Sequence, residues 1–282
     1  MHINKLYLGV YVMKLYKILA AFACGSFFVS GAQANEDFVS PLYVPSELET
    51  LSTTSLTYER TNFDGGASKE DLILRETALV GFGQESAVKA SIGNRFNLKG
   101  ITSEQYNNEH NFDYELGLIK NWRSENGLIV QTGASYYTYN PRSWYGRSAQ
   151  AKEKIREHKG NTRWYKEARA EIKAGYELDD GLLPYASLGI DANLDDADRD
   201  FYYNAFAGVH KLENDFAYGA GLRYEFETSA DKNKTLSAEI NADYYINDTM
   251  SVGGVVDYRV TGDEEPKIDS QYSAEARFKI LF

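Results

Sequence analysis

The chain has 282 residues, with 30 Lys and Arg against 41 Asp and Glu, a net charge of −11 and one cysteine. An acidic balance of this size argues against nucleic-acid binding, which needs a basic surface field. After residue 34, no stretch approaches the roughly 20 consecutive apolar residues that a membrane-spanning helix needs. A membrane span in this part of the chain must therefore be built from strands.

The N-terminal residues have the layout of a cleaved secretory signal. Lys14 and Lys17 precede a largely apolar run over residues 18–29, and Ala-Gln-Ala follows at residues 32–34. We predict a signal peptide over residues 1–34, with Met13 as an alternative start, and a mature chain that begins at Asn35. Cys24 would leave with the signal, so the mature chain would contain no thiol. It would carry 27 basic and 41 acidic residues, a net charge of −14.

Strict alternation of apolar and polar residues recurs about twelve times along the mature chain, which is the pattern of strands with one apolar face. The first two repeats are weaker, because either phase around Glu76 puts one charge on the apolar face. No repeat, low-complexity tract or linker divides the chain, so we predict one domain. The segments cover residues 51–62, 72–82, 88–96, 112–122, 128–139, 164–178, 184–194, 201–209, 216–226, 236–246, 250–260 and 272–282.

The last segment alternates to the end of the chain and stops on Phe282. One face carries tyrosine, alanine, phenylalanine and isoleucine, and the other carries Glu275, Arg277 and Lys279. This strand resembles the closing strand of Gram-negative outer-membrane β-barrels. In that family the terminal aromatic residue belongs to the signal that the barrel-assembly machinery recognises, so the resemblance implies an assembly signal formed by Phe278, Ile280 and Phe282.

The connections separate a membrane barrel from a soluble sandwich, which alternation alone cannot do. Short turns at residues 83–86, 123–127, 179–181, 213–215 and 247–249 interleave with mostly longer connections at 63–69, 97–108, 140–161, 195–200, 228–235 and 261–269. This asymmetry is expected when all turns on one side face the periplasm. A β-structure in hydrocarbon must also close, since an open edge would leave backbone groups without partners.

We therefore predict an all-β fold, a closed antiparallel transmembrane β-barrel over residues 51–282 with about 12 strands, 10 or 14 being the alternatives. The expected location is the cell outer membrane, with both barrel termini on the periplasmic side. Residues 35–50 would form a periplasmic N-terminal segment, which leaves little room for a plug helix before the first strand. On the apolar phase, aromatic residues gather at both strand ends, as in the two girdles of such barrels.

The opposite phase of the strands predicts a lumen with dense charges of both signs. Such a lumen must be wet or internally paired, because isolated buried ions are costly. A wet lumen would form a narrow, weakly selective diffusion pore for small polar solutes, whereas a paired one would belong to a plugged structural or adhesin-like barrel. The predicted lumen charges are Arg75, Lys89, Arg95, Asp113, Glu115, Glu167, Arg169, Glu171, Lys173, Asp191, Arg223, Glu225, Glu239, Asp243, Asp257, Arg259, Glu275, Arg277 and Lys279.

The longest connection, residues 140–161, is a basic patch in an acidic protein. Three interpretations stay open: a constriction folded into the mouth, a site for the phosphates of lipopolysaccharide, or a solvated loop. The residues of the possible constriction are Arg142, Arg147, Lys152, Lys154, Arg156 and Lys159.

Little in the sequence indicates an enzyme, although a few outer-membrane barrels are lipases or proteases. The mature chain has three histidines, His110, His158 and His210, and no catalytic motif accompanies them. The aspartates at residues 195–200 lack the Gly and Glu that a calcium-binding EF-hand loop needs. We expect no cofactor and no metal. The expected partners are outer-membrane lipid, lipopolysaccharide, the barrel-assembly machinery and small polar solutes.

Overall fold

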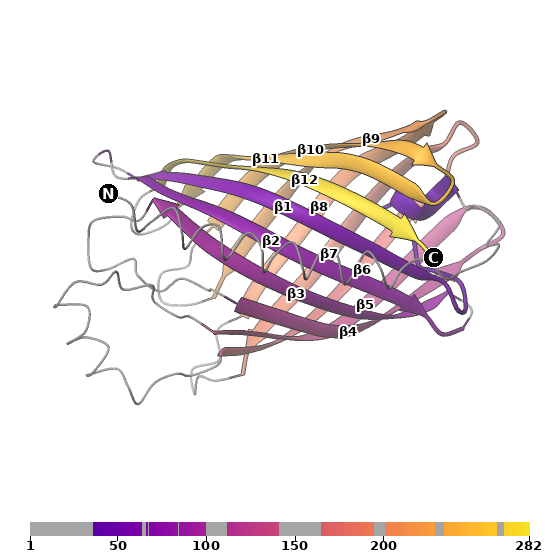
Figure 1. Ribbon diagram of the computed structural model, residues 1–282, viewed down its shortest axis with the longest axis horizontal. Helices are drawn as coiled ribbons and strands as arrows, with labels where there is room; N and C mark the ends of the chain where they lie inside the picture. Colours follow the sequence, from indigo (N-terminus) through magenta and orange to yellow (C-terminus); the bar gives the residue numbers. More distant parts are fainter. Residues whose placement is uncertain are drawn as a thin grey trace, which may run out of the picture. The chain divides into compact units, whose positions relative to one another are not determined.

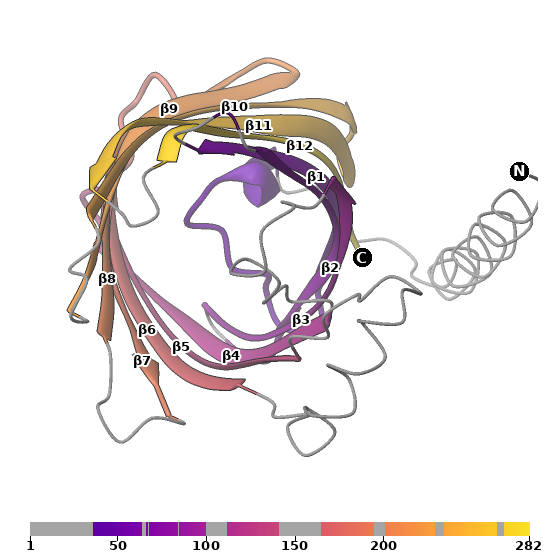
Figure 2. The same ribbon diagram turned by 90° about the vertical axis from the view of Figure 1, so that its left-hand side faces the viewer.

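The computed structural model describes residues 36–63, 66, 68–83, 85–99, 112–140, 165–194, 201–228, 234–263 and 268–282. These residues form a closed ring of twelve strands in which every neighbouring pair is antiparallel, as Figures 1 and 2 show. The predicted fold class and strand number are therefore confirmed. The strands are β1 (Thr50–Phe63), β2 (Ser68–Gly81), β3 (Ser86–Lys99), β4 (Phe112–Arg123), β5 (Leu128–Asn140), β6 (Tyr165–Tyr176), β7 (Leu182–Asn193), β8 (Phe201–Glu213), β9 (Phe216–Glu227), β10 (Lys234–Asn247), β11 (Met250–Asp263) and β12 (Ile268–Leu281).

The ring closes where the last strand pairs with the first. Leu281 lies opposite Leu51, and the ladder continues along both strands to Phe63 opposite Ile268, with one irregularity at Asn62 and Phe63. Since the strand number is even, β1 begins and β12 ends at the same end of the barrel. That end also carries the connections between β2 and β3, β4 and β5, β6 and β7, β8 and β9, and β10 and β11. We call it the short-turn end, and the opposite end the long-loop end.

Glycine allows one of these short turns to pass close to the neighbouring hairpin. Gly181 lies between β6 and β7 with φ 76°, and its carbonyl accepts a hydrogen bond from the Leu212 amide at 3.1 Å. A Cβ on Gly181 would lie 2.8 Å from the Leu212 carbonyl oxygen, so a side chain would be both strained and crowded there. Such contacts stabilise the short-turn rim.

Large apolar side chains on one phase of the strands are exposed around the ring. Leu116 is 61% exposed on β4, Leu188 64% on β7 and Ile240 60% on β10. A soluble protein rarely exposes contiguous apolar surface on this scale, whereas lipid-facing strands require it. Among the described residues, no helix is long and apolar enough to cross a membrane.

Residues 36–49, here called the N-terminal segment, lie inside the ring rather than beyond its end (Figure 2). They begin with a 3-10 helix, Glu36–Val39, and continue as extended chain and turns. Phe38, Val39 and Tyr43 pack with Leu51 and other interior residues of the short-turn end. The sequence predicted a periplasmic segment with little room for a plug helix. Residues 36–49 occupy the interior of the short-turn end as extended chain with one helical turn, and their periplasmic location stays a prediction.

The barrel and the N-terminal segment belong to one compact unit, residues 35–281. The predicted signal peptide at residues 1–34 lies outside the described residues.

Candidate functional site

The lumen is the candidate functional site, because the interior phase of the strands carries ionic side chains that meet across strand boundaries. Arg75 on β2 reaches over β3 to Asp113 on β4, with Nη2 at 2.9 and 3.0 Å from the two carboxylate oxygens. Gly93 on β3 provides the room for this contact, since a Cβ there would lie 2.5 Å from Asp113 Oδ2. The Arg75 contact also fixes the phase of β2, which places Glu76 on the outer face.

A second pair lies on the same side of the lumen. Lys89 Nζ on β3 is 2.9 Å from Glu115 Oε2 on β4, and the other oxygen, Oε1, accepts a hydrogen bond from Ser135 Oγ at 2.7 Å. The Glu115 carboxylate is therefore held on both oxygens.

Arg169 on β6 joins several of the predicted residues. Its Nη2 is 2.8 Å from Glu167 Oε2, its Nε is 3.7 Å from Asp191 Oδ2, and its guanidinium carbon lies 3.6 Å from the centre of the Tyr137 ring. Ion pairing and stacking on an aromatic face together hold an arginine in one orientation. Closer to the short-turn end of the same strand, Lys173 Nζ lies 3.2 Å from Glu171 Oε2.

The opposite wall has a corresponding group. Arg223 on β9 bonds to Glu239 on β10 at 2.6 Å and lies 4.0 Å from Asp257 on β11. Its guanidinium carbon is 5.9 Å from the ring centre of Phe206, which itself stacks on Tyr185 at 5.2 Å. Aromatic side chains of β7 and β8 thus meet the charged side chains of β9 to β11 on this wall.

The most deeply buried ionic group lies near the short-turn end. Asp243 is 1% exposed and pairs with Arg277, whose Nε lies 2.9 Å from Oδ1, and with Lys279, whose Nζ lies 3.5 Å from Oδ2. A Cβ on Gly253 would overlap the Asp243 carboxylate, so this glycine makes the cluster possible. A buried carboxylate held by two cations is stable as a group but leaves a costly charge if a partner is removed.

An ionic group at the long-loop end includes residues that the sequence analysis missed. Asp71 is 2% exposed and pairs with Arg95 at 2.9 Å and with Lys69 at 3.0 Å, while Glu59 lies 3.4 Å from Arg95 and accepts a hydrogen bond from Gln271. Only Arg95 was predicted. The alternation of β1 and β2 was too weak to set a phase, but Asp71 and Arg75 are four residues apart on one strand and therefore share a face, which is the signal that could have found Asp71.

The remaining predicted lumen charges take other positions on the interior phase. Glu275 accepts a hydrogen bond from Thr57 at 3.2 Å. Arg259 is buried at 5% exposure beside Gly262, and Glu225 lies exposed towards the long-loop end.

A cavity of about 480 Å³ remains between the N-terminal segment and the wall, which β1 to β8 and β12 contribute. Phe38, Pro41 and Tyr43 line it from the segment, and paired cations line it from the wall. Those cations are Arg75, Lys89, Arg169, Lys173 and Lys279, and their carboxylate partners are Asp113, Glu115, Glu167, Glu171 and Asp243. Five cations and three carboxylates, Glu115, Glu171 and Asp191, thus line the cavity itself, and the other carboxylates pair with these cations from beside it.

Solved structures share this architecture. The COG4313 outer membrane channel from Pseudomonas putida F1 superposes with a TM-score of 0.61 at 12% identity, covering 86% of this chain and 98% of the channel. The NanC porin gives a TM-score of 0.52 at 10% identity, covering 80% and 98%, and the β domain of the Bordetella autotransporter BrkA gives 0.51 at 11%, covering 84% and 100%. No protein-family model and no curated protein matches the sequence.

The chain has the fold of an outer-membrane β-barrel protein. Identities this low establish the fold and leave the activity to be argued from the lumen itself.

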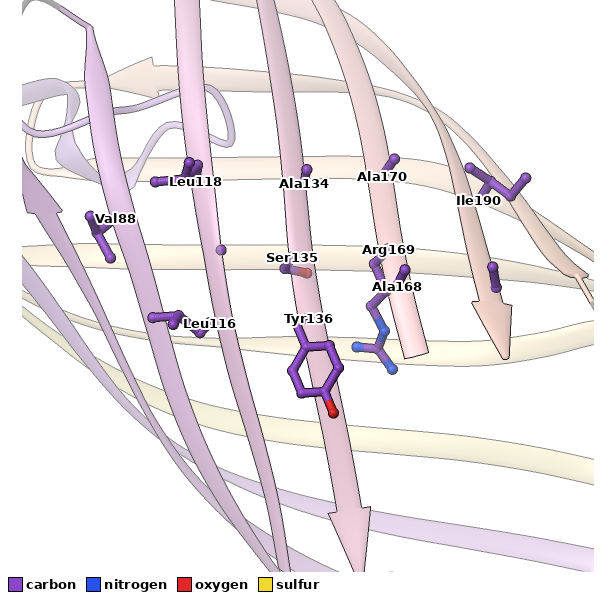
Figure 3. Close-up of a pocket in the computed structure, with 12 residues that line it drawn as sticks. Val88, Leu116, Leu118, Ala134, Ser135, Tyr136, Ala168, Arg169, Ala170 and Ile190 are labelled. Atoms are coloured by element: carbon purple, nitrogen blue, oxygen red, sulfur yellow. The ribbon is translucent and has the colours of Figure 1, made fainter. Parts of the chain in front are cut away.

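The outer face of this outer-membrane barrel is apolar between β4 and β7. A shallow hollow of about 810 Å³ lies there, with Ala134, Ala168 and Ala170 at its centre and Leu116, Leu118 and Ile190 around it (Figure 3). Small residues flanked by large aliphatic ones give a band that suits acyl chains. Phe278 and Ile280 occupy the outer phase of β12, and their role in assembly stays a prediction.

Glu76 is an exception on the outer face. It lies on β2 opposite Thr54 of β1 and Ile92 of β3, between the aromatic residues of the two strand ends. The hydroxyl groups of Ser52 and Thr54 each donate a hydrogen bond to a different oxygen of its carboxylate. Glu76 is therefore a carboxylate on the outer face of the barrel, and each of its two oxygens accepts a hydrogen bond from a neighbouring side chain.

Several predicted sites lie outside the described residues. They are the six cations of the possible constriction, Arg142 to Lys159, the aspartates at 195–200, and His110 and His158. In the part of the chain that is described, no group of three or more His, Cys, Asp or Glu side chains is arranged to hold a metal ion. His210, the described histidine of the barrel, is buried at the short-turn end in a small space beside Val39, Leu183 and Tyr245.

Proposed function

We propose that this protein is a narrow, weakly selective diffusion channel for small polar solutes. The observation that carries the proposal is the cavity of about 480 Å³, lined by paired charges, that the lumen retains above the N-terminal segment. Ion pairs and amides give passing solutes both donors and acceptors. Because each lining cation is paired with a carboxylate, neither sign of charge dominates the path strongly, which favours weak rather than strong charge selection.

The outer membrane is the proposed location, with the short-turn end and both barrel termini towards the periplasm. The exposed apolar girdle supports a membrane position, and short turns on one side with longer connections on the other are the usual arrangement of bacterial barrels. Lipopolysaccharide and the barrel-assembly machinery are the partners that this location implies.

A closed structural or adhesin-like barrel is the second candidate, and one specific observation favours it. Phe38 and Leu42 of the N-terminal segment are 1% and 0% exposed, so this segment seals part of the short-turn end tightly. An enzyme is the least supported candidate, since His210 is enclosed mostly by apolar side chains and faces the N-terminal segment rather than the membrane or the long-loop end.

Single-channel recording in planar bilayers separates these candidates. We expect discrete openings of small conductance from the purified full chain and, under a salt gradient, a reversal potential close to zero. A steep preference for one ion sign would contradict weak selection. Complete silence from protein that migrates as a folded, heat-modifiable barrel would support the closed structural barrel instead.

A further inference from the structure

The N-terminal segment is not part of the barrel wall. The ring closes through β1 and β12 from Leu51 opposite Leu281 onwards, and no described residue between 36 and 49 belongs to a strand. Its backbone contact with the strands comes at its end, where the Gly81 amide donates to the Glu49 carbonyl and the Leu48 amide to the Gly81 carbonyl. The wall is therefore complete without this segment.

Two wall side chains bond to the backbone of the segment. Asn121 Nδ2 on β4 donates to the Leu42 carbonyl at 2.7 Å, and Gln131 Nε2 on β5 holds Asn121 in place by donating to its Oδ1 at 2.9 Å. Lys279 Nζ on β12 lies 3.5 Å from the Val39 carbonyl, positioned by its ion pair with Asp243. Two separate parts of the ring, β4 and β12, thus each hold one carbonyl of the segment.

Apolar side chains of the segment also pack against the wall. Phe38 meets Tyr245 edge to face, with ring centres 5.3 Å apart, and Leu42 packs with Ile129 and Leu183. The segment and the strands meet here through side chains alone. Such contacts between separate elements can form and break together in one local opening.

A local turn connects the segment to the wall. The Glu49 amide donates to the Ser46 carbonyl at 3.0 Å, the Ser46 amide donates to Glu49 Oε2 at 2.8 Å, and Leu48 has φ 70°. Its remaining bonds go to Gly81 of β2 and to the Tyr43 hydroxyl, which donates to Glu49 Oε2 at 3.3 Å. Since the backbone bonds of the turn do not involve residues 36–45, the turn can persist whether or not these residues occupy the lumen, which makes it a pivot.

We propose that the short-turn half of the lumen is a binding site for the chain's own residues 36–45, that Asn121 and Lys279 hold this ligand, and that its release widens the channel. The proposal rests on the proposed channel function and assigns its regulation. A segment bound by two carbonyl contacts and a few apolar side chains exchanges between bound and released states, whereas a strand in the ladder would not.

Deletion and replacement of the segment test this directly. We expect the variant that lacks residues 36–45 to fold as a heat-modifiable barrel and to conduct several times more current per channel than the full chain. A synthetic peptide of residues 36–45, added on the short-turn side, should restore the low conductance, and a scrambled peptide should not. Equal conductance with and without the segment, or equal effects of both peptides, would overturn the proposal. Silence of both proteins would instead remove the channel function itself.

Substitutions then test the two residues that hold the segment. Asn121→Ala and Lys279→Met should each raise the open fraction roughly two- to tenfold, the value of a typical net hydrogen bond. Asp243 keeps its pair with Arg277 in the lysine variant, so the barrel persists. Asn241→Ala is the matched control, because Asn241 lies on the interior phase of β10 beside Gly219.

The same substitutions in the deletion background distinguish a holding role from a general effect on the lumen. Lys279 also lines the cavity, so the readout here is the open fraction and not the conductance. Without residues 36–45, Asn121→Ala and Lys279→Met should leave the open fraction unchanged, since the group that they hold is absent. An equal effect of either substitution in both backgrounds would show that it acts on the wall, and would overturn its assignment.

Discussion

Leu42 of the N-terminal segment packs directly over Gly175 of β6. A Cβ on Gly175 would lie 2.7 Å from Leu42 Cδ1, 3.0 Å from Leu183 Cδ1 and 3.1 Å from Tyr185 Cβ. The absence of a side chain at residue 175 therefore creates the recess into which Leu42 fits. The contact between Leu42 and Gly175 therefore fixes where the segment meets the wall.

Gly175→Ala should loosen the segment, because overpacking at a filled contact costs about 1–3 kcal/mol. We expect larger mean currents in single-channel recordings, and partial reversal when Leu42→Ala is added. Gly133→Ala is the matched control: a Cβ there meets nothing closer than 3.7 Å. Indistinguishable currents from the two alanine variants would contradict the fit described here.

Asp243→Ala should destabilise the barrel itself. The substitution leaves Arg277 and Lys279 near one another without their shared carboxylate, and removing one partner from a buried ionic group costs about 3–5 kcal/mol. Urea unfolding in detergent, followed by heat-modifiable migration, measures the loss. Asp248→Asn in the exposed turn between β10 and β11 should change stability by less than about 0.5 kcal/mol. A similar midpoint for both variants would show that the cluster contributes little.

Glu76 should depend on its two hydroxyl donors. Replacing Ser52 and Thr54 together by alanine removes both hydrogen bonds from a carboxylate on the lipid-facing phase, at about 1–3 kcal/mol for the unsatisfied group. In the Glu76→Leu background the same double substitution should be nearly neutral, since no carboxylate needs the donors. A double-mutant cycle on unfolding free energies measures this coupling. If the double substitution lowers the unfolding free energy equally in the two backgrounds, the hydroxyl groups do not act through Glu76.

Removal of Phe282 should separate assembly from stability. The last ladder pair is Leu281 with Leu51, and the Leu281 amide donates to the Thr249 carbonyl at 2.8 Å, so the ring is complete before residue 282. The refolded truncation should unfold at the same denaturant concentration as the full chain. In cells it should reach the outer membrane in smaller amounts, as the resemblance to assembly signals implies. A stability loss in vitro with normal assembly would reverse this assignment.

The strands were predictable from the sequence because side-chain direction along a strand is a local property with a period of two. Residues 112–122 and 216–226 alternate cleanly, and β4 and β9 match them within a residue. The turns were predictable for the same local reason. β1 and β2 were less well determined, because charge lies on both phases around Glu76, and only the contact of Arg75 with Asp113 decides which phase faces inwards.

The N-terminal segment could not be predicted. Residues 38–46 have no period of two or 3.6, and Pro41 and Pro45 interrupt any ladder. What places them in the lumen is a set of recesses contributed by distant strands, such as the one over Gly175, and no local pattern encodes such a set.

The sequence by itself determined that the chain alternates, which residues share a face of each strand, and that the strands end in short turns on one side. The tertiary structure decided which strand closes the ring, which carboxylate each cation meets, and what occupies the lumen. The physical reason is distance: alternation follows from neighbouring residues, while the pairing of Arg277 with Asp243 depends on the register of strands that are 34 residues apart in the chain.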